Sequence, residues 1–140
     1  MIKMLLSKNY IESQVCIALE EDLGKLGDIT SQATVPQNQK SSAKIKLKQD
    51  AVLCGIDFAC LAFKLLDKKI KISARKKDGS YLKKGSTILK LHGNTQAILA
   101  AERTALNFLG LMSGIATKAK NYSKIAKKYG SEIYLSLIHI

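Results

Sequence analysis

The amino-acid sequence predicts an α+β fold in which a layer of strands is flanked by helices. Apolar residues recur every three or four positions in some segments and at every second position in others, which are the periods of helices and strands. Turn-forming residues separate the strand-like segments. The chain has 140 residues, of which 46% are hydrophobic and only one is proline, so it can form one ordinary domain with a core.

The first predicted helix begins after Ser7, which can cap it, and ends at Gly24. Residues 24–36 are rich in Gly, Asp, Thr and Ser, and we expect them to form a loop. The apolar face of the helix is predicted from four residues at helical spacing, namely Ile11, Val15, Ala18 and Leu19.

The middle of the chain alternates between strand and helix patterns. Residues 42–49 place an apolar residue at every second position and lysines between them, which predicts a half-buried strand with a lysine face toward water. Residues 51–55 are expected to form a second short strand, residues 56–66 a helix with a buried stripe, and residues 69–75 another strand.

Two turn pairs, at 78–79 and 84–85, precede a strand predicted at residues 87–91. Asn94 or Thr95 can then cap a helix.

The C-terminal part of the chain reads as two helices and the beginning of a strand. The first helix starts at about Gln96 and is expected to break near residues 113–114, where Ser and Gly are adjacent. A second helix continues to about Lys128, and residues 132–135 look like the start of a strand.

The net charge of +12 admits two interpretations, a binding site for anions or a lysine-rich solvated surface. Only Arg75 and Arg103 are arginines, so 23 − 2 = 21 of the basic residues are lysines, which do not provide the bidentate fork of arginine. The chain has no Trp and only 6% aromatic residues, so it lacks the stacking surface that single strands require. We therefore expect no nucleic-acid partner.

The sequence also predicts a soluble, cytoplasmic protein. No apolar run approaches the roughly 18 residues that a membrane span needs, so we expect no membrane partner. The opening segment is too short in its apolar part for a secretory signal. Cys16, Cys54 and Cys60 form no C-x-x-C pair and are interpreted as small buried hydrophobic residues.

One segment, residues 96–117, carries a pattern that points to chemistry. Its apolar residues share one broad helical face, which we expect in the core: Ile98, Ala101, Ala105, Phe108, Leu109 and Met112. Nearly opposite lies a narrow stripe of Arg103, Asn107, Gly110 and Gly114. Small residues let a ligand or backbone approach closely, and arginine offers two hydrogen bonds to a carboxylate. Periodicity alone, however, leaves Arg103 as a solvated surface residue.

The same segment resembles the long-helix signature of the quinolinate phosphoribosyltransferase family. The matching residues are Glu102-Arg-Thr-Ala-Leu-Asn-Phe-Leu109 and Ser113-Gly-Ile-Ala-Thr117. Three further segments resemble family motifs in the same order: an acidic loop (Glu20 or Glu21 with Asp22-Leu-Gly24, then Gly27-Asp-Ile-Thr30), the strand Ala51-Val-Leu-Cys-Gly55, and the paired turns Asp78-Gly79 and Lys84-Gly85.

The resemblance implies both a fold and a reaction. In the family, an N-terminal α/β sandwich domain with a strand layer and flanking helices precedes an incomplete α/β barrel. The enzymes transfer the phosphoribosyl group of phosphoribosyl pyrophosphate, with Mg²⁺, to quinolinate; loss of CO₂ gives nicotinate mononucleotide for NAD biosynthesis. Subunits form a homodimer or higher homo-oligomer that shares active sites. Arg103 is then implied to bind the substrate carboxylate across the subunit interface, and no catalytic or metal-binding residue is assigned.

The resemblance also divides the chain. Residues 1–112 correspond to the N-terminal domain, and residues 113–140 to the first helix and the strand start of a truncated barrel. The last five residues, 136–140, do not match the "DTRKT"-like strand expected there. We therefore expect an N-terminal fragment that lacks the barrel contacts and is inactive by itself. His139 receives no role, and His92 is expected to be structural or exposed.

Two alternatives remain open at this point. A phosphoribosyltransferase-fold homologue of the molybdenum-transport type would share these N-terminal motifs and differ in barrel residues that the chain does not contain. A biotinyl/lipoyl-like binding module would share the turn and strand spacing of residues 78–93. Such a module needs a modifiable lysine at a hairpin tip, and no Met-Lys-Met or Asp-Lys-Ala-type tip is present.

Overall fold

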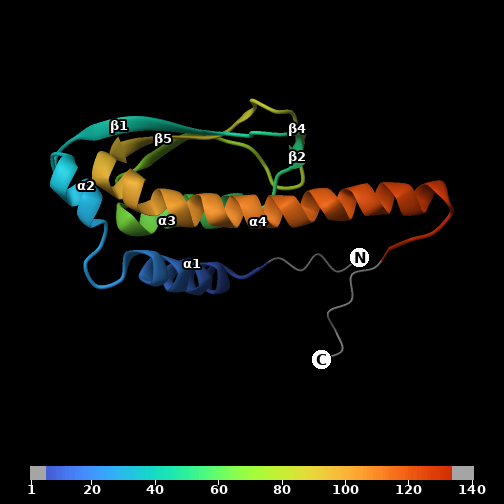
Figure 1. Ribbon diagram of the computed structural model, residues 1–140, viewed down its shortest axis with the longest axis horizontal. Helices are drawn as coiled ribbons and strands as arrows, with labels where there is room; N and C mark the ends of the chain where they lie inside the picture. Colours follow the sequence, from blue (N-terminus) through green and yellow to red (C-terminus); the bar gives the residue numbers. More distant parts are fainter. Residues whose placement is uncertain (1–5, 134–140) are drawn as a thin grey trace.

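The computed structural model describes residues 6–133 and confirms the α+β class. Three layers are visible in Figure 1: a strand layer, the helices α3 and α4 beneath it, and α1 on the far side of those helices. The elements along the chain are α1 (Lys8–Leu23), α2 (Ile29–Thr34), β1 (Lys40–Lys46), β2 (Ala51–Val52), α3 (Ile56–Leu66), β3 (Lys71–Arg75), β4 (Tyr81–Leu82), β5 (Thr87–Asn94) and α4 (Thr95–Lys128).

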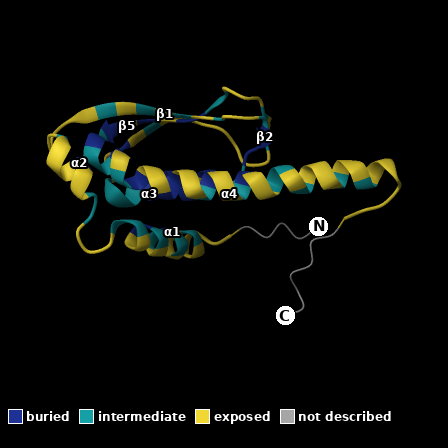
Figure 2. Cartoon of the chain, viewed as in Figure 1, coloured by how far each residue is buried: buried dark blue, intermediate teal, exposed yellow. Residues whose placement is uncertain are grey.

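The strands form two antiparallel sheets. In the larger sheet β5 lies between β1 and β3, and in the smaller one β2 pairs with β4. Along β1 the residues alternate between exposed and half-buried, because successive side chains of a strand point to opposite faces. The inner face packs toward α3 and α4, and the outer face of the larger sheet is not covered by any helix among the described residues (Figure 2).

The core lies between the sheet and the α3–α4 layer and extends to α1. Its fully buried large side chains come from every layer: Val15 from α1, Ile56 and Phe63 from α3, Leu53 and Ile70 from the connections, and Leu89 and Leu91 from β5. Burial of each such side chain stabilises the fold by about 1.5–3 kcal/mol. Helix α4 joins this core through four buried apolar residues, namely Ile98, Ala101, Ala105 and Leu109.

Helix α1 follows the prediction at both ends. The Ser7 hydroxyl oxygen accepts a hydrogen bond from the Tyr10 amide, and Gly24 ends the helix with a positive φ of 53°. Val15 and Leu19 are buried on the predicted face. The expectation that residues 24–36 are entirely loop was wrong, because they contain the short helix α2.

Helix α2 has a local cause. Asp28 caps its first turn, accepting a hydrogen bond from the Ser31 amide at 3.0 Å. The segment also has a tertiary support, since the Gln96 side chain donates to the Val35 carbonyl at 2.7 Å. A helix of 6 residues is too short to show a periodic apolar face, so its sequence looked like loop.

The predicted strands exist with shifted ends. The first begins at Lys40 and ends at Lys46, the second covers only two residues, and β5 extends through Gly93 to Asn94. The short strand β4 lies between the two predicted turns and was not foreseen. Of the final predicted strand, residues 132 and 133 are not in a strand, and residues 134–135 lie outside the described part of the chain.

Helix α4 contradicts the predicted break near residues 113–114. It runs without interruption for 34 residues, from the Asn94 cap to Lys128. A glycine in a helix costs about 1 kcal/mol, and Ser113 on the adjacent position faces inward and is buried. The packing of this helix outweighs that cost. The proposed boundary between residues 112 and 113 thus falls inside a helix, and the division into two domains stays a prediction.

Within residues 6–133, no helix combines the length and the apolar character needed to cross a bilayer.

Candidate functional site

Arg103 lies on the exposed face of α4, as its helical spacing predicts. The opposite face forms core: Ile98, Ala101, Ala105 and Leu109 are buried, and Phe108 and Met112 are partly buried. The Arg103 side chain is 78% exposed, and Asn107, Gly110 and Gly114 share its stripe. A Cβ atom added to either glycine would meet no neighbouring atom within 4 Å, so the space in front of the stripe is open.

A carboxylate of α1 lies beside this arginine. Asp22 Oδ1 is 4.0 Å from Arg103 Nη1, while the other oxygen, Oδ2, accepts a hydrogen bond of 2.5 Å from the hydroxyl of Thr104. Thr104 is buried and the Asp22 side chain is only 20% exposed. The carboxylate is therefore held in place, whereas the guanidinium is loosely tethered and keeps most of its donors in solvent.

Arg103 and Asp22 line a cavity that also includes a second carboxylate, Asp28. The cavity has a volume of about 400 Å³ and is bounded by Asp22, Asp28, Leu99 and Arg103, among others. Hydrogen bonds from the Ser31 hydroxyl and amide lower the pKa of Asp28, so this carboxylate is charged at neutral pH. The Asp28 carboxylate already accepts the hydrogen bonds that cap α2. The site thus combines one outward-facing cation with two carboxylates that are already hydrogen-bonded within the fold.

The acidic loop motif and the helix motif therefore meet in space. Asp22 and Asp28 belong to the acidic loop motif and Arg103 to the helix motif, and neither motif by itself predicts that one cavity joins them. The bonded pair Asp22 and Thr104 is separated by 82 residues. No local signal in the sequence reports a contact over that distance.

Among residues 6–133, the cysteines and histidine do not gather with acidic side chains into a group of three or more. All three cysteines are free thiols, and burial raises the pKa of both Cys54 and Cys60, which keeps them protonated. Cys60 is buried as predicted, whereas Cys16 and Cys54 are only partly buried. His92 is exposed, with its Nδ1 atom 3.0 Å from the Ser42 hydroxyl. His139 lies outside the described residues.

Comparison with known proteins identifies the family. A family model described as quinolinate phosphoribosyl transferase, N-terminal domain, matches residues 28–113, which is more than half of the chain. The chain belongs to this family. The match spans the turns and strands on which the biotinyl/lipoyl alternative rested.

Members of the quinolinate phosphoribosyltransferase family resemble the chain over most of its length. A chloroplastic nicotinate-nucleotide pyrophosphorylase [carboxylating] of Arabidopsis thaliana is 38% identical over 110 residues, which are 79% of this chain and 32% of that protein. A probable nicotinate-nucleotide pyrophosphorylase [carboxylating] of Methanocaldococcus jannaschii is 35% identical over 126 residues, which are 90% of this chain and 43% of that protein.

The fold agrees with solved structures of the same family. The nicotinate-nucleotide pyrophosphorylase of Francisella tularensis superposes with a TM-score of 0.82 and 32% identity, covering 89% of this chain and 43% of that one. The chain therefore spans less than half the length of these relatives.

The second half of the family's helix signature has a structural explanation. The Ser113 hydroxyl accepts a hydrogen bond from the Cys54 amide and donates one to the Cys54 carbonyl, at 3.0 and 3.1 Å. One turn later the Thr117 hydroxyl accepts from the Val52 amide at 2.9 Å. These two hydroxyls attach the segment around β2 to α4. In this signature, Ser113 and Thr117 thus serve the fold, whereas the Arg103 stripe faces open space.

Proposed function

We propose that this chain is the N-terminal part of an enzyme that transfers the phosphoribosyl group of phosphoribosyl pyrophosphate to quinolinate, with decarboxylation to nicotinate mononucleotide. In this proposal Arg103 binds a carboxylate of quinolinate held in the barrel of a neighbouring subunit. The proposal rests mainly on one observation: the guanidinium of Arg103 projects from α4 and is exposed on an open surface.

The surroundings of Arg103 suit recognition of an acidic substrate. Arginine and a carboxylate form two parallel hydrogen bonds, which fix orientation as well as charge. Asp22 stands at 4.0 Å, beyond hydrogen-bonding distance, so it orients the guanidinium without occupying its donors. Gly110 and Gly114 leave room for a partner surface along the same stripe. Holding a dianionic substrate in position is a large part of what such a transfer requires.

Magnesium has no evident site in the described part of the chain. Among residues 6–133, no group of three or more acidic, histidine or cysteine side chains is close enough to hold a metal ion. We propose that Mg²⁺ enters with phosphoribosyl pyrophosphate and is bound in the portion of the relatives that this chain does not span.

The proposal is tested with a chimera. Residues 1–128 replace the equivalent part of the Methanocaldococcus jannaschii relative, whose aligned region is 126 residues long, and nicotinate mononucleotide formation is followed with both substrates and Mg²⁺. We expect the chimera to turn over and the 140-residue chain alone to show no turnover. Arg103→Lys keeps the charge but loses the fork, and should raise the KM for quinolinate by about 10- to 100-fold.

Arg75→Lys is the matched control. Arg75 is the other arginine of the chain and is paired with Asp57 at 2.7 Å, away from the cavity. Its replacement should leave both KM values unchanged. Equal losses for quinolinate and phosphoribosyl pyrophosphate in Arg103→Lys would show that the role assigned to Arg103 is wrong. A chimera that accepts a different substrate in place of quinolinate would refute the proposed reaction.

A further inference from the structure

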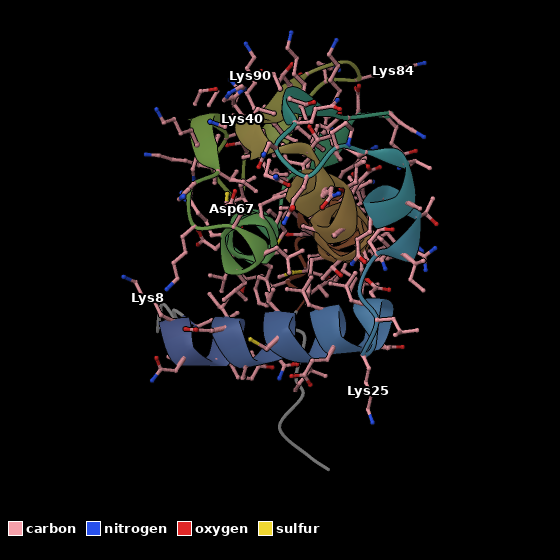
Figure 3. The ribbon with its side chains drawn as sticks, turned by 90° about the vertical axis from the view of Figure 1, so that its left-hand side faces the viewer. Lys8, Lys25, Lys40, Asp67, Lys84 and Lys90 are labelled. Carbon is pink, nitrogen blue, oxygen red and sulfur yellow. The ribbon has the colours of Figure 1, made fainter. Side chains whose placement is uncertain are left out.

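The outer face of the sheet β1-β5-β3 is a surface of unpaired lysines. The exposed positions of β1 are its even-numbered residues, and the exposed positions of β5 include Lys90 and His92. Helices pack on the opposite face only, so these side chains point away from the core. Figure 3 shows Lys40 and Lys90 on the same side of the molecule, remote from α1.

The strand register places like charges next to each other. Lys44 is the direct partner of Lys90 across the β1–β5 ladder. In the adjacent row, His92 pairs with Ser42 on one side and with Lys71 on the other. Like charges directly opposite one another destabilise a sheet. This face therefore carries an electrostatic strain that the local fold does not relieve.

In the part of the chain that the structure describes, no acidic side chain forms an ion pair with a lysine of this face. The strands β1, β3 and β5 contain neither Asp nor Glu. The ion pairs within residues 6–133 join Arg75 to Asp57, Lys83 to Asp50 and Arg103 to Asp22, so none includes a lysine of the sheet face. The positive charge on the face is thus available to a bound anion.

We propose that this face binds an oligophosphate anion, held by Lys40, Lys44, Lys71 and Lys90, with His92 in the same row as Lys71. Neighbouring strands lie about 4.8 Å apart and alternate residues about 7 Å apart, so the lysines form a compact grid that a short chain of linked phosphates can span. The face offers no aromatic ring for stacking bases. Recognition therefore rests on the phosphate charges.

A cavity lies at one end of the lysine grid. It has room for the part of a longer phosphate ligand that extends beyond the lysines. It has a volume of about 960 Å³, and its lining includes Lys40, Lys69, Lys71 and His92. The two carboxylates in its wall are engaged elsewhere: Asp28 caps α2, and Asp67 accepts a hydrogen bond from the Lys69 amide at 2.8 Å. This cavity adjoins the Arg103 cavity, since both are lined by Leu23, Gly27, Asp28 and Ala100, but Arg103 itself lines only the other one. The proposed phosphate site does not depend on the proposed enzymatic function.

Binding is tested with sodium tripolyphosphate by calorimetric titration of the 140-residue chain. We expect one saturable site, weakened about tenfold or more by Lys44→Gln or Lys90→Gln, because each removes a charge-assisted contact. Lys124→Gln is the control, since Lys124 is an exposed lysine of α4 in no ion pair. Absence of saturable binding, or an equal loss in Lys124→Gln, would overturn the proposal.

Thermal unfolding supplies a second measurement. Without ligand, Lys44→Gln and Lys90→Gln should each raise the midpoint, and the double variant should gain less than the sum, because either change removes the repulsion. Tripolyphosphate should raise the midpoint of the unmodified chain but not of the double variant. An equal rise with sulfate at the same ionic strength would reduce the effect to screening and refute the site. Saturable binding of a 20-base-pair duplex but not of tripolyphosphate would instead indicate a nucleic-acid surface and also refute it.

Discussion

At the scale of single residues, Gly55 shows how closely the layers approach. It precedes α3 with a φ of 96°, and an added Cβ atom would lie 2.9 Å from Met112 Sδ and 3.3 Å from the Phe108 carbonyl oxygen. Since Gly55 has no side chain to cap the helix, Asp78 does so from a distant turn. Its carboxylate accepts hydrogen bonds from the Gly55 and Ile56 amides at 2.9 and 3.1 Å. The aspartate of the turn motif at residues 78–79 thus has a structural role, which is to cap α3.

Gly55→Ala should lower the free energy of unfolding by about 2–4 kcal/mol, the sum of a left-handed backbone penalty and an overpacked contact. The measurement is urea denaturation. Gly85→Ala separates the two causes, because Gly85 has a similar φ of 84° but no neighbouring atom within 4 Å. That variant should lose only the backbone part, about 1–2 kcal/mol. Equal losses in both would mean that the contact with α4 is unimportant.

At the scale of elements, α4 joins most parts of the fold. It contacts α1, α2, α3 and the strands β1, β2 and β5. Its hydroxyls at Ser113 and Thr117 hold the backbone around β2, which pairs with β4 over only two residues. Because β2 is so short, it depends on this helix rather than on a long ladder of strand hydrogen bonds.

Ser113→Ala should destabilise the protein by about 1–3 kcal/mol, because the Cys54 amide loses its acceptor in a partly buried place. Chemical denaturation gives the size of the effect, and amide hydrogen exchange at Cys54 should accelerate. Ser123→Ala, on the same helix and without an observed hydrogen bond, should be nearly neutral. If the two variants behave alike, the hydroxyl is not what attaches β2.

At the scale of the whole molecule, the C-terminal half of α4 extends beyond the other layers (Figure 1). Five large apolar residues of this half are each more than half exposed, and we call them the α4 stripe: Leu111, Ile115, Tyr122, Ile125 and Tyr129. They follow one another at intervals of four, seven, three and four residues, which is helical spacing. The sequence between Glu102 and Glu132 contains no acidic residue and several lysines. Such an apolar stripe bordered by like charges favours association once the charges are screened.

We expect the 140-residue chain to self-associate in a concentration-dependent way, more strongly at high salt than at low salt, as measured by sedimentation velocity. Ile115→Lys combined with Ile125→Lys should shift the population toward monomer. Asn121→Lys adds charge to the same helix outside the α4 stripe and should have little effect. A stable monomer at every concentration and salt would contradict this expectation.

Most of the longer helices and strands could be predicted from the sequence, because periodicity and capping depend on neighbouring residues; the short elements α2 and β4 could not. The same signals predicted the alternation of β1, the caps at Ser7 and Asn94, the buried face of α4 and the outward position of Arg103. The continuity of α4 was misjudged, since the packing of Ser113 against the β2 segment outweighs the local Ser-Gly signal.

Contacts between distant elements could be seen only once the chain was folded. The pairing of Asp22 with Thr104 and Arg103 joins residues about eighty positions apart, and the pairing of Lys44 with Lys90 depends on strand register. Both arise from long-range packing, whose energy is set by the shape of the assembled core. For that reason the sequence could name Arg103 but could not show the carboxylate of Asp22 beside it, nor the lysine grid on the outer face of the sheet.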